Sequence, residues 1–105
     1  MKKVYICSPL RGDMQNNIAN AQEYCREACA NGVLPIAPHI YFTQFLNDLD
    51  PAQRKAGMEM GLEQLTDCSE IWVYGDISEG MAKEISIAKA LGIAVVYKDG
   101  ISPRR

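Results

Sequence analysis

Short apolar segments alternate with stretches of helical periodicity along the whole chain. Each segment carries apolar residues at successive positions, as is typical of strands covered on both faces. Strands separated by helices imply parallel pairing with right-handed crossovers. The sequence therefore predicts an α/β fold: a small doubly wound, Rossmann- or flavodoxin-like parallel sheet of four strands in the order 2-1-3-4, with helices on both faces. We expect strands at 4–7, 33–37, 70–74 and 93–97, and helices from Asn16 or Asn17 to about 30, at 41–47, at 51–66 and from 79 to about 92.

Local signals indicate where these elements begin and end. Pro35 cannot donate to a strand ladder, so the second strand is expected at an edge of the sheet. Asp50 followed by Pro51 is typical of an N-cap with proline in the first helical position. The inner faces of the first and third helices are expected to be Ile18, Ala21, Cys25, Ala28 and Cys29, and Met58, Gly61, Leu62 and Leu65.

Length and charge limit the classes of protein that this chain can represent. Its 105 residues correspond to a single domain over 1–105, with 98–105 expected to be a flexible tail. A net charge of -2 argues against a partner that is a nucleic-acid polymer, because such proteins present a basic surface. No apolar run approaches the length of a membrane span, and Ser8-Pro9 interrupts the run near the N-terminus. We expect a soluble cytoplasmic protein that does not bind membranes.

The cysteines and the single histidine do not form a recognisable metal or redox motif. Four cysteines are spread along the chain without a C-x-x-C pair, so reduced and mostly buried thiols are expected and no metal site. Neither a G-x-G-x-x-G fingerprint nor a P-loop is present. We expect no cofactor, and a flavodoxin-like electron carrier is disfavoured because the loop after the first strand is poor in serine and threonine.

Glu84 is the residue that the helical pattern explains least well. It heads the stripe completed by Ile87, Ala88 and Leu91, and its i±4 neighbours are Gly80 and Ala88, so no helical lysine pairs with it. A carboxylate that faces a sheet without a partner is costly unless chemistry requires it. Glu84 is therefore either a functional carboxylate or a residue at the edge of the stripe that reaches water.

Two loops are expected to meet at the carboxyl ends of the strands. In doubly wound sheets ligands bind there, near the switch point, which in this order lies between strands 1 and 3. Loop 8–13 brings Arg11, whose role is either to bind a phosphate or to hydrogen-bond a base. Loop 75–80 leads into the helix that carries Glu84, and Ser78 can cap that helix.

Two segments resemble a known enzyme family. Tyr5-Ile6-Cys7-Ser8-Pro9-Leu10-Arg11-Gly12 resembles the first-strand signature Y-F-C-G-S-I-R-G of 2'-deoxynucleoside 5'-phosphate N-hydrolases, and Ser78-Glu79-Gly80-Met81-Ala82-Lys83-Glu84 resembles their S-x-G-x-x-x-E segment. Ala37-Pro38-His39 falls where the hydrolases have a histidine. The chain is thus similar to the nucleoside 2-deoxyribosyltransferase-like superfamily, closest to these hydrolases and their compact phage and bacterial relatives.

The resemblance implies an enzyme that cleaves the N-glycosidic bond of a nucleoside 5'-monophosphate or nucleoside, as a hydrolase or a deoxyribosyltransferase. Glu84 corresponds to the catalytic nucleophile, Tyr5 could orient it, and Asp76 is an additional acid at the mouth of the site. A homodimer is also implied. The substrate-binding residues that we expect are Ser8, Arg11, Gly12, His39, Ser78, Gly80 and Met81.

One departure from the family keeps a second function open. Both branches carry an aspartate in the helix before strand 3, in a D-L-N-x-[LI]-like pattern. The corresponding segment here is Gly61-Leu62-Glu63-Gln64-Leu65, which lacks that aspartate. The alternative is a nucleotide-binding module, a sensor or sequestering protein, that uses the same pocket without turnover.

Overall fold

A computed structural model describes residues 1–98 of the chain. The expected tail over 98–105 lies outside the described residues, apart from Lys98. The elements, in chain order, are β1 (Lys3–Cys7), α1 (Met14–Ala30), β2 (Leu34–Ile36), α2 (Pro38–Tyr41), the 3-10 helix η1 (Phe42–Gln44), α3 (Pro51–Leu65), β3 (Glu70–Val73), α4 (Glu79–Ala90) and β4 (Ala94–Tyr97).

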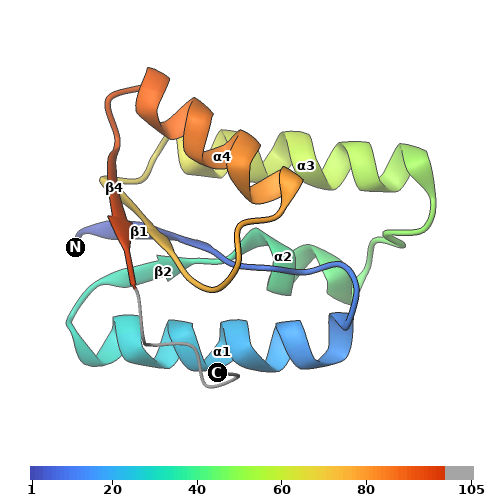
Figure 1. The fold of residues 1–105 in the computed structure, drawn as a ribbon, viewed down its shortest axis with the longest axis horizontal. Coiled ribbons are helices and arrows are strands. Elements are labelled where there is room, and N and C mark those ends of the chain that lie inside the picture. Colours follow the sequence, from blue (N-terminus) through green and yellow to red (C-terminus); the bar gives the residue numbers. More distant parts are fainter. Residues whose placement is uncertain (99–105) are drawn as a thin grey trace.

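The predicted sheet is confirmed. Its order is β2-β1-β3-β4, and all three pairings are parallel, with Tyr5 opposite Ile36 on one side and Ile71 on the other. The strand that contains Pro35 is at an edge, as its missing N–H requires. Helix α1 covers one face of the sheet, and α3 and α4 cover the other (Figure 1).

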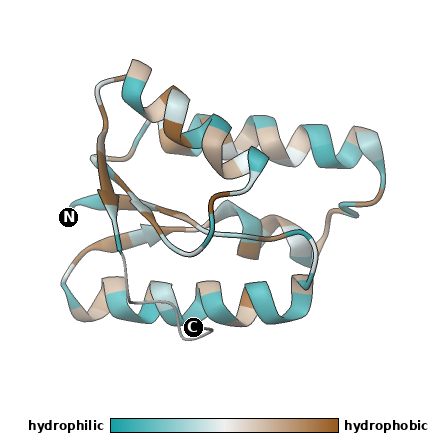
Figure 2. Cartoon of the chain, in the orientation of Figure 1, coloured by the Kyte–Doolittle hydropathy of each residue, from teal (hydrophilic) through white to brown (hydrophobic). Residues whose placement is uncertain are grey.

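The sheet separates two apolar cores. Alternation along the strands sends Val4 and Ile6 of β1 toward α1, and Tyr5 and Cys7 toward α3 and α4. The strands are largely apolar along their length, whereas the helices alternate between apolar and polar residues (Figure 2). Each face of β1 therefore supports a different layer, and the face toward α3 and α4 brings polar groups of Tyr5 and Cys7 into its core.

The first helix differs from the prediction at its start and in its buried face. Its N-cap is Asp13, whose side chain accepts from the backbone N–H of Asn16, rather than Asn16 or Asn17. Starting from this cap, the helix buries Asn20, Ala21, Tyr24 and Ala28 and leaves Cys29 exposed. The expected stripe was therefore partly wrong, because Tyr24 finds a stacking partner in Tyr74.

Two further expectations need correction. The helix expected at 41–47 begins earlier, at Pro38, and continues as a 3-10 turn to Gln44. Proline is well suited to the first turn of a helix, where its missing N–H has no partner in any case. On the other side of the sheet, Met58 and Leu91 are exposed by 39% and 52%, so neither belongs to the core in which it was placed.

The two loops at the switch point pack against each other. Gly75 has a positive φ of 76°, and a Cβ at this position would lie 3.3 Å from Cδ of Pro9. Gly75 therefore allows the turn after β3 to pass close to the turn after β1. This contact places the start of α4 beside the carboxyl end of β1, where the sequence predicted a binding crevice.

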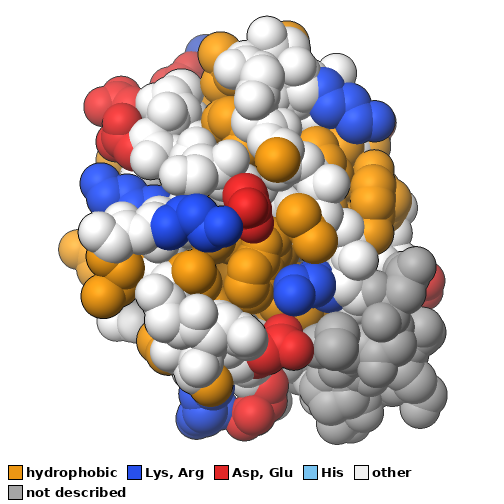
Figure 3. Space-filling model, turned by 90° about the vertical axis from the view of Figure 1, so that its left-hand side faces the viewer, with side chains coloured by type: hydrophobic (Ala, Val, Ile, Leu, Met, Phe, Trp, Pro, Cys, Tyr) orange, Lys and Arg blue, Asp and Glu red, His pale blue; other side chains and the backbone are white. Residues whose placement is uncertain are grey.

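The side of the molecule that carries β4 presents charged and apolar side chains together. Basic and acidic side chains are interspersed there among apolar ones, and neither charge collects into a single patch (Figure 3). No helix in the described part of the chain is long and apolar enough to cross a membrane. Cys7, Cys25, Cys29 and Cys68 are all free thiols.

Candidate functional site

A cavity of about 320 Å³ opens at the carboxyl end of β1. Its walls come from the loop after β1, from α2 and η1, from the first three turns of α3 and from the start of α4. It lies on the α3 and α4 side of the sheet, at the predicted switch point. The polar and charged side chains that line it are Tyr5, Ser8, Arg11, His39, Thr43, Asp48, Gln53, Arg54, Ser78, Glu79, Lys83 and Glu84.

Glu84 receives a hydrogen bond on each of its carboxylate oxygens. The hydroxyl of Tyr5 donates to Oε2 at 2.6 Å, and the thiol of Cys7 donates to Oε1 at 3.4 Å. Tyr5 and Cys7 are two residues apart on β1, so both point to the same side of the sheet. No lysine or arginine among the described residues forms an ion pair with Glu84. The carboxylate is thus fixed in orientation by neutral donors alone.

Burial and hydrogen bonding act on the pKa of Glu84 in opposite directions. Burial raises the pKa above its ordinary value, and the bonds from Tyr5 and Cys7 lower it again, with burial the stronger effect. Burial and the nearby carboxylate raise the pKa values of Tyr5 and of Cys7. Both side chains therefore stay protonated near neutral pH and remain donors to Glu84.

Ser8 and His39 form a second polar pair in the cavity. The hydroxyl of Ser8 and Nε2 of His39 are 2.8 Å apart and share a hydrogen bond. Burial lowers the pKa of His39 to about 4, so its imidazole is neutral near pH 7. A neutral histidine held by a serine can donate or accept a hydrogen bond, but it carries no charge to a ligand.

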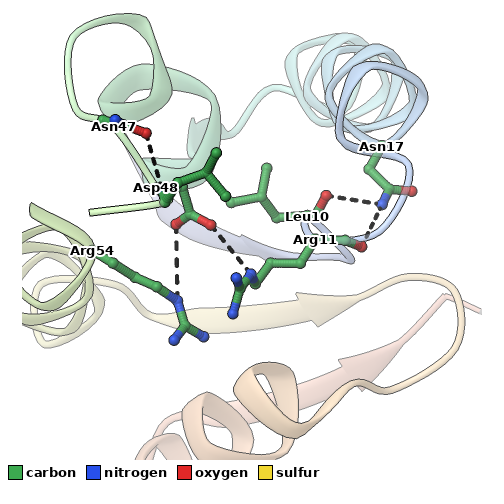
Figure 4. Close-up of polar contacts among 7 residues, drawn as sticks. Leu10, Arg11, Asn17, Asn47, Asp48 and Arg54 are labelled. Carbon is green, nitrogen blue, oxygen red and sulfur yellow. Dashed lines mark hydrogen bonds and ion pairs between the residues drawn. The ribbon is translucent and has the colours of Figure 1, made fainter. Parts of the chain in front are cut away.

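Arg11 and Arg54 meet at the carboxylate of Asp48. Nε of Arg11 lies 3.3 Å from Oδ2, and Nε of Arg54 lies 4.0 Å from Oδ1. Figure 4 shows Asp48 between the two guanidinium groups. Asn17 holds the Arg11 segment in place, because its side-chain amide donates to the carbonyl oxygens of Leu10 and Arg11 at 3.0 and 3.2 Å.

The start of α4 forms another wall of the cavity. Ser78 is the N-cap, and its hydroxyl accepts from the backbone N–H of Met81 at 3.3 Å. Gly80 is exposed, and a Cβ there would meet nothing within 4 Å. The first turn of this helix is therefore open on its cavity side, and its remaining N–H groups favour an anion or a polar group.

The cavity contains most of the residues that the sequence indicated. Gly12 and Asp76 are exceptions: both are exposed and neither lines the cavity, so the structure does not bring them to Glu84. The predicted residues that do line it are Tyr5, Ser8, Arg11, His39, Ser78, Gly80, Met81 and Glu84.

Several lining residues were not found from the sequence. Asp48 was assigned to a loop and Arg54 to the first turns of a helix, and neither pattern indicates a partner on the loop after β1. One signal was present for α3, where Gly57 and Gly61 lie at i, i+4 and so share a face. That face lines the cavity.

Gly61 is the position where the resemblance implies an aspartate. A Cβ added here would lie 3.4 Å from Cβ of Pro38 and 3.5 Å from the hydroxyl oxygen of Tyr5. These are ordinary contact distances, so the backbone at 61 faces the cavity beside the Tyr5–Glu84 pair. In the described part of the chain, the residues of α3 that line the cavity include no acid.

Two solved structures share the fold. A 2-deoxyribosyltransferase from Bacillus psychrosaccharolyticus aligns over 90% of this chain and 70% of its own length, with a TM-score of 0.67 and 17% identity. A 2-deoxyribosyltransferase from Leishmania mexicana aligns over 97% and 77%, with a TM-score of 0.61 and 20% identity. At these identities the likeness establishes the fold alone.

The family of the chain is shown by its sequence. Residues 2–98 match the family described as "Domain of unknown function (DUF7768)", and the chain belongs to it. No curated protein matches the sequence.

Proposed function

We propose that the protein cleaves the N-glycosidic bond of a nucleoside or nucleoside 5'-monophosphate, with Glu84 as nucleophile. The observation that carries this proposal is the state of Glu84, a mostly buried carboxylate that lines a cavity and is held on both oxygens by Tyr5 and Cys7. The shared fold with two 2-deoxyribosyltransferases supports the same class of substrate.

The chemistry needs an anion at the sugar and a place for the departing base. A carboxylate oxygen of Glu84 attacks C1', the bond from C1' to the base nitrogen breaks, and its electron pair leaves with the base, which takes a proton from water. Water, or a second base, then attacks C1' and releases the carboxylate of Glu84. The Ser8–His39 pair offers the base a neutral hydrogen-bonding edge in the same cavity.

Tyr5 has a positioning role in this scheme. Its hydroxyl holds Oε2 of Glu84 at 2.6 Å, within the range of a charge-assisted O–H···O⁻ bond. This leaves Oε1, which has only the weaker thiol donor, as the oxygen that is freer to attack. The pair on β1 therefore orients the nucleophile and selects which of its oxygens reacts.

The test is base release from a panel of ribo- and deoxyribonucleosides and their 5'-monophosphates, followed by chromatography. We expect the wild-type protein to release free base from at least one compound, and the Glu84→Ala protein to release none. Adding a second base to the reaction separates hydrolysis from transfer, because only a transferase forms the new nucleoside. Base release that persists in Glu84→Ala contradicts the assignment of the nucleophile.

The glycine at position 61 favours a second candidate, a nucleotide-binding module without turnover. Among the described residues, α3 contributes no acid to the cavity beside the Tyr5–Glu84 pair, and the implied aspartate would stand at position 61. In this case ligands raise the melting temperature but no compound in the panel loses its base. Gly61→Asp, with Gly61→Ala as matched control, then separates the two: gain of base release only in Gly61→Asp assigns the missing activity to that acid.

A further inference from the structure

We propose that Arg11 and Arg54, held by Asp48, form a subsite for the phosphate of a phosphate monoester. This inference rests on the proposed function and narrows its substrate class to nucleoside 5'-monophosphates. The subsite is assembled from three separate segments: the loop after β1, the loop before α3 and the first turns of α3 (Figure 4). All three side chains line the same cavity as Glu84.

The way in which Asp48 holds the arginines leaves their best donors available. Both contacts use Nε, at 3.3 Å for Arg11 and 4.0 Å for Arg54. Among the described residues, no ion pair or hydrogen bond engages a terminal nitrogen of either guanidinium group. Each arginine therefore presents its two terminal NH₂ groups, which can bind phosphate oxygens in a bidentate manner.

The burial of Asp48 suits it to orient the two arginine side chains. Its side chain is only 17% exposed, and Oδ2 is buried without a hydrogen bond, so the ion pair with Arg11 is its main compensation. A carboxylate that is removed from water and approached by two cations restricts both side chains. This lowers the entropic cost of bringing two flexible arginines to one anion.

Charge within the cavity separates the two ends of a nucleotide. Two arginines and one aspartate leave this cluster with a net positive charge, while Glu84 lines the same cavity without an ion-pair partner among the described residues. Glu79 and Lys83, which also line the cavity, add one charge of each sign. A phosphate dianion is repelled by Glu84 and attracted to the arginines. A phosphate bound at the arginines would leave the sugar to meet Glu84.

A purely structural ion-pair cluster is the competing explanation. The arginine side chains are 53% and 41% exposed, and exposed pairs of this kind contribute about 0–1 kcal/mol to stability. Such a cluster would only tie the loops to α3, and its loss would lower the melting temperature without changing the preference between ligands. The ratio of affinities for a nucleotide and its nucleoside therefore distinguishes the two explanations.

The experiment measures binding by calorimetry in the Glu84→Gln protein, so that no ligand is consumed. The probes are a deoxyribonucleoside, its 5'-monophosphate, 2-deoxyribose 5-phosphate and inorganic phosphate. We expect Arg54→Gln and Arg11→Gln each to weaken binding of the monophosphate about tenfold and to leave nucleoside binding within about twofold.

Two further variants serve as controls. Arg54→Lys keeps the charge but loses the bidentate guanidinium group, so its affinity for the monophosphate should lie between those of the unaltered Glu84→Gln protein and its Arg54→Gln variant. Arg26→Gln removes an arginine on α1 that is paired with Glu23 outside the cavity, and should change nothing.

The outcomes separate the subsite from the activity. Three results would each overturn the subsite. They are equal affinities of the Glu84→Gln protein for nucleoside and monophosphate, equal losses of affinity for both ligands in Arg54→Gln, and no binding of any phosphate probe. The subsite is supported if the monophosphate binds more tightly than inorganic phosphate or the sugar phosphate, and if this preference is lost in the arginine variants. Such a result also identifies the nucleotide as the source of the phosphate. Base release by the wild-type protein is measured separately, so a failed subsite leaves the proposed cleavage intact, and a failed cleavage leaves the subsite intact.

Discussion

Two buried tyrosines, one on each face of the sheet, donate hydrogen bonds to glutamates from α-helices. Tyr5 donates to Glu84 of α4 at 2.6 Å, and Tyr74 donates to Glu27 of α1 at 2.7 Å. Tyr74 also stacks on Tyr24, with ring centroids 3.9 Å apart, and neither it nor Glu27 lines the cavity. On the other face, the thiol of Cys7 donates to the second oxygen of Glu84, and the carboxylate faces the cavity.

The difference shows that a tyrosine–glutamate bond is not itself a sign of chemistry. On the α1 face the bond satisfies the hydroxyl of a tyrosine that is packed into the core. On the α3 and α4 face the same bond orients a carboxylate that has one side open to a ligand. What marks the second pair is the cavity and the additional donor, both of which require the tertiary structure.

The largest difference between the pairs is expected in catalysis. Glu84→Gln keeps the size of the side chain but removes the proposed nucleophile, and should lower kcat/KM for base release at least about a thousandfold. The matched Glu27→Gln protein should stay within about twofold of wild type, because Glu27 is outside the cavity. Comparable losses in the two variants would show that the glutamates act only through the stability of the fold.

The two tyrosines should separate activity from stability. Tyr5→Phe removes the donor that orients Glu84, and should lower kcat roughly 10- to 100-fold. Tyr74→Phe keeps the stacked ring but loses one hydrogen bond, and should lower the free energy of unfolding by about 1 kcal/mol with little change in kcat. Steady-state kinetics and urea denaturation of both proteins check this. If Tyr74→Phe is as inactive as Tyr5→Phe, the contrast between the faces fails.

The second donor, which only Glu84 has, should appear in the pH profile. The thiol of Cys7 lowers the pKa of Glu84, so Cys7→Ala should raise that pKa further. The acid limb of the kcat/KM profile then moves to higher pH, because a nucleophilic carboxylate must be ionised. Cys7→Ser keeps a donor and serves as the control, with a limb near that of wild type. A limb that does not move in Cys7→Ala means that the thiol contact does not tune Glu84.

Much of the fold could be predicted because its signals are local. Pro35, Asp50 and Pro51 each act through the backbone of their own segment, and the parallel pairing of the strands follows from the alternation of strands and helices. Glu84 was conspicuous for the same reason, since a carboxylate heads an apolar stripe in the sequence. In the structure it lies beside the buried face of α4, which consists of Met81, Ile85 and Ala88. The buried face of α1 was less predictable because Tyr24 is drawn inward by Tyr74, a partner fifty residues later in the chain.

The parts of the site that were missed depend on contacts between distant segments. Asp48 and Arg54 are ordinary loop and helix-start residues by local criteria, and they become part of a cavity only when Arg11 approaches from the loop after β1. Conversely, Asp76 was predicted to belong to the site because it is close in sequence to Ser78. In the structure it lies on the exposed turn after β3, outside the cavity. Closeness in sequence was a poor guide to which residues line the cavity.

The smallest expected difference lies in how stability depends on pH. The folded protein holds the Glu84 proton more tightly than the unfolded chain, because burial raises the folded pKa. Between the unfolded and folded pKa values the folded state binds more protons, so stability falls as pH rises through that window. Glu84→Gln removes this slope, so its free energy of unfolding should rise relative to that of wild type as pH rises.

His39 acts in the opposite direction, since its pKa is lowered to about 4 and stability is lost as pH falls from about 6.5 toward that value. Because both proteins retain His39, the difference in their unfolding free energies, measured by urea denaturation across this range, isolates Glu84. A difference that is independent of pH would mean that the folded and unfolded pKa values of Glu84 are equal, so that the bonds from Tyr5 and Cys7 fully offset its burial.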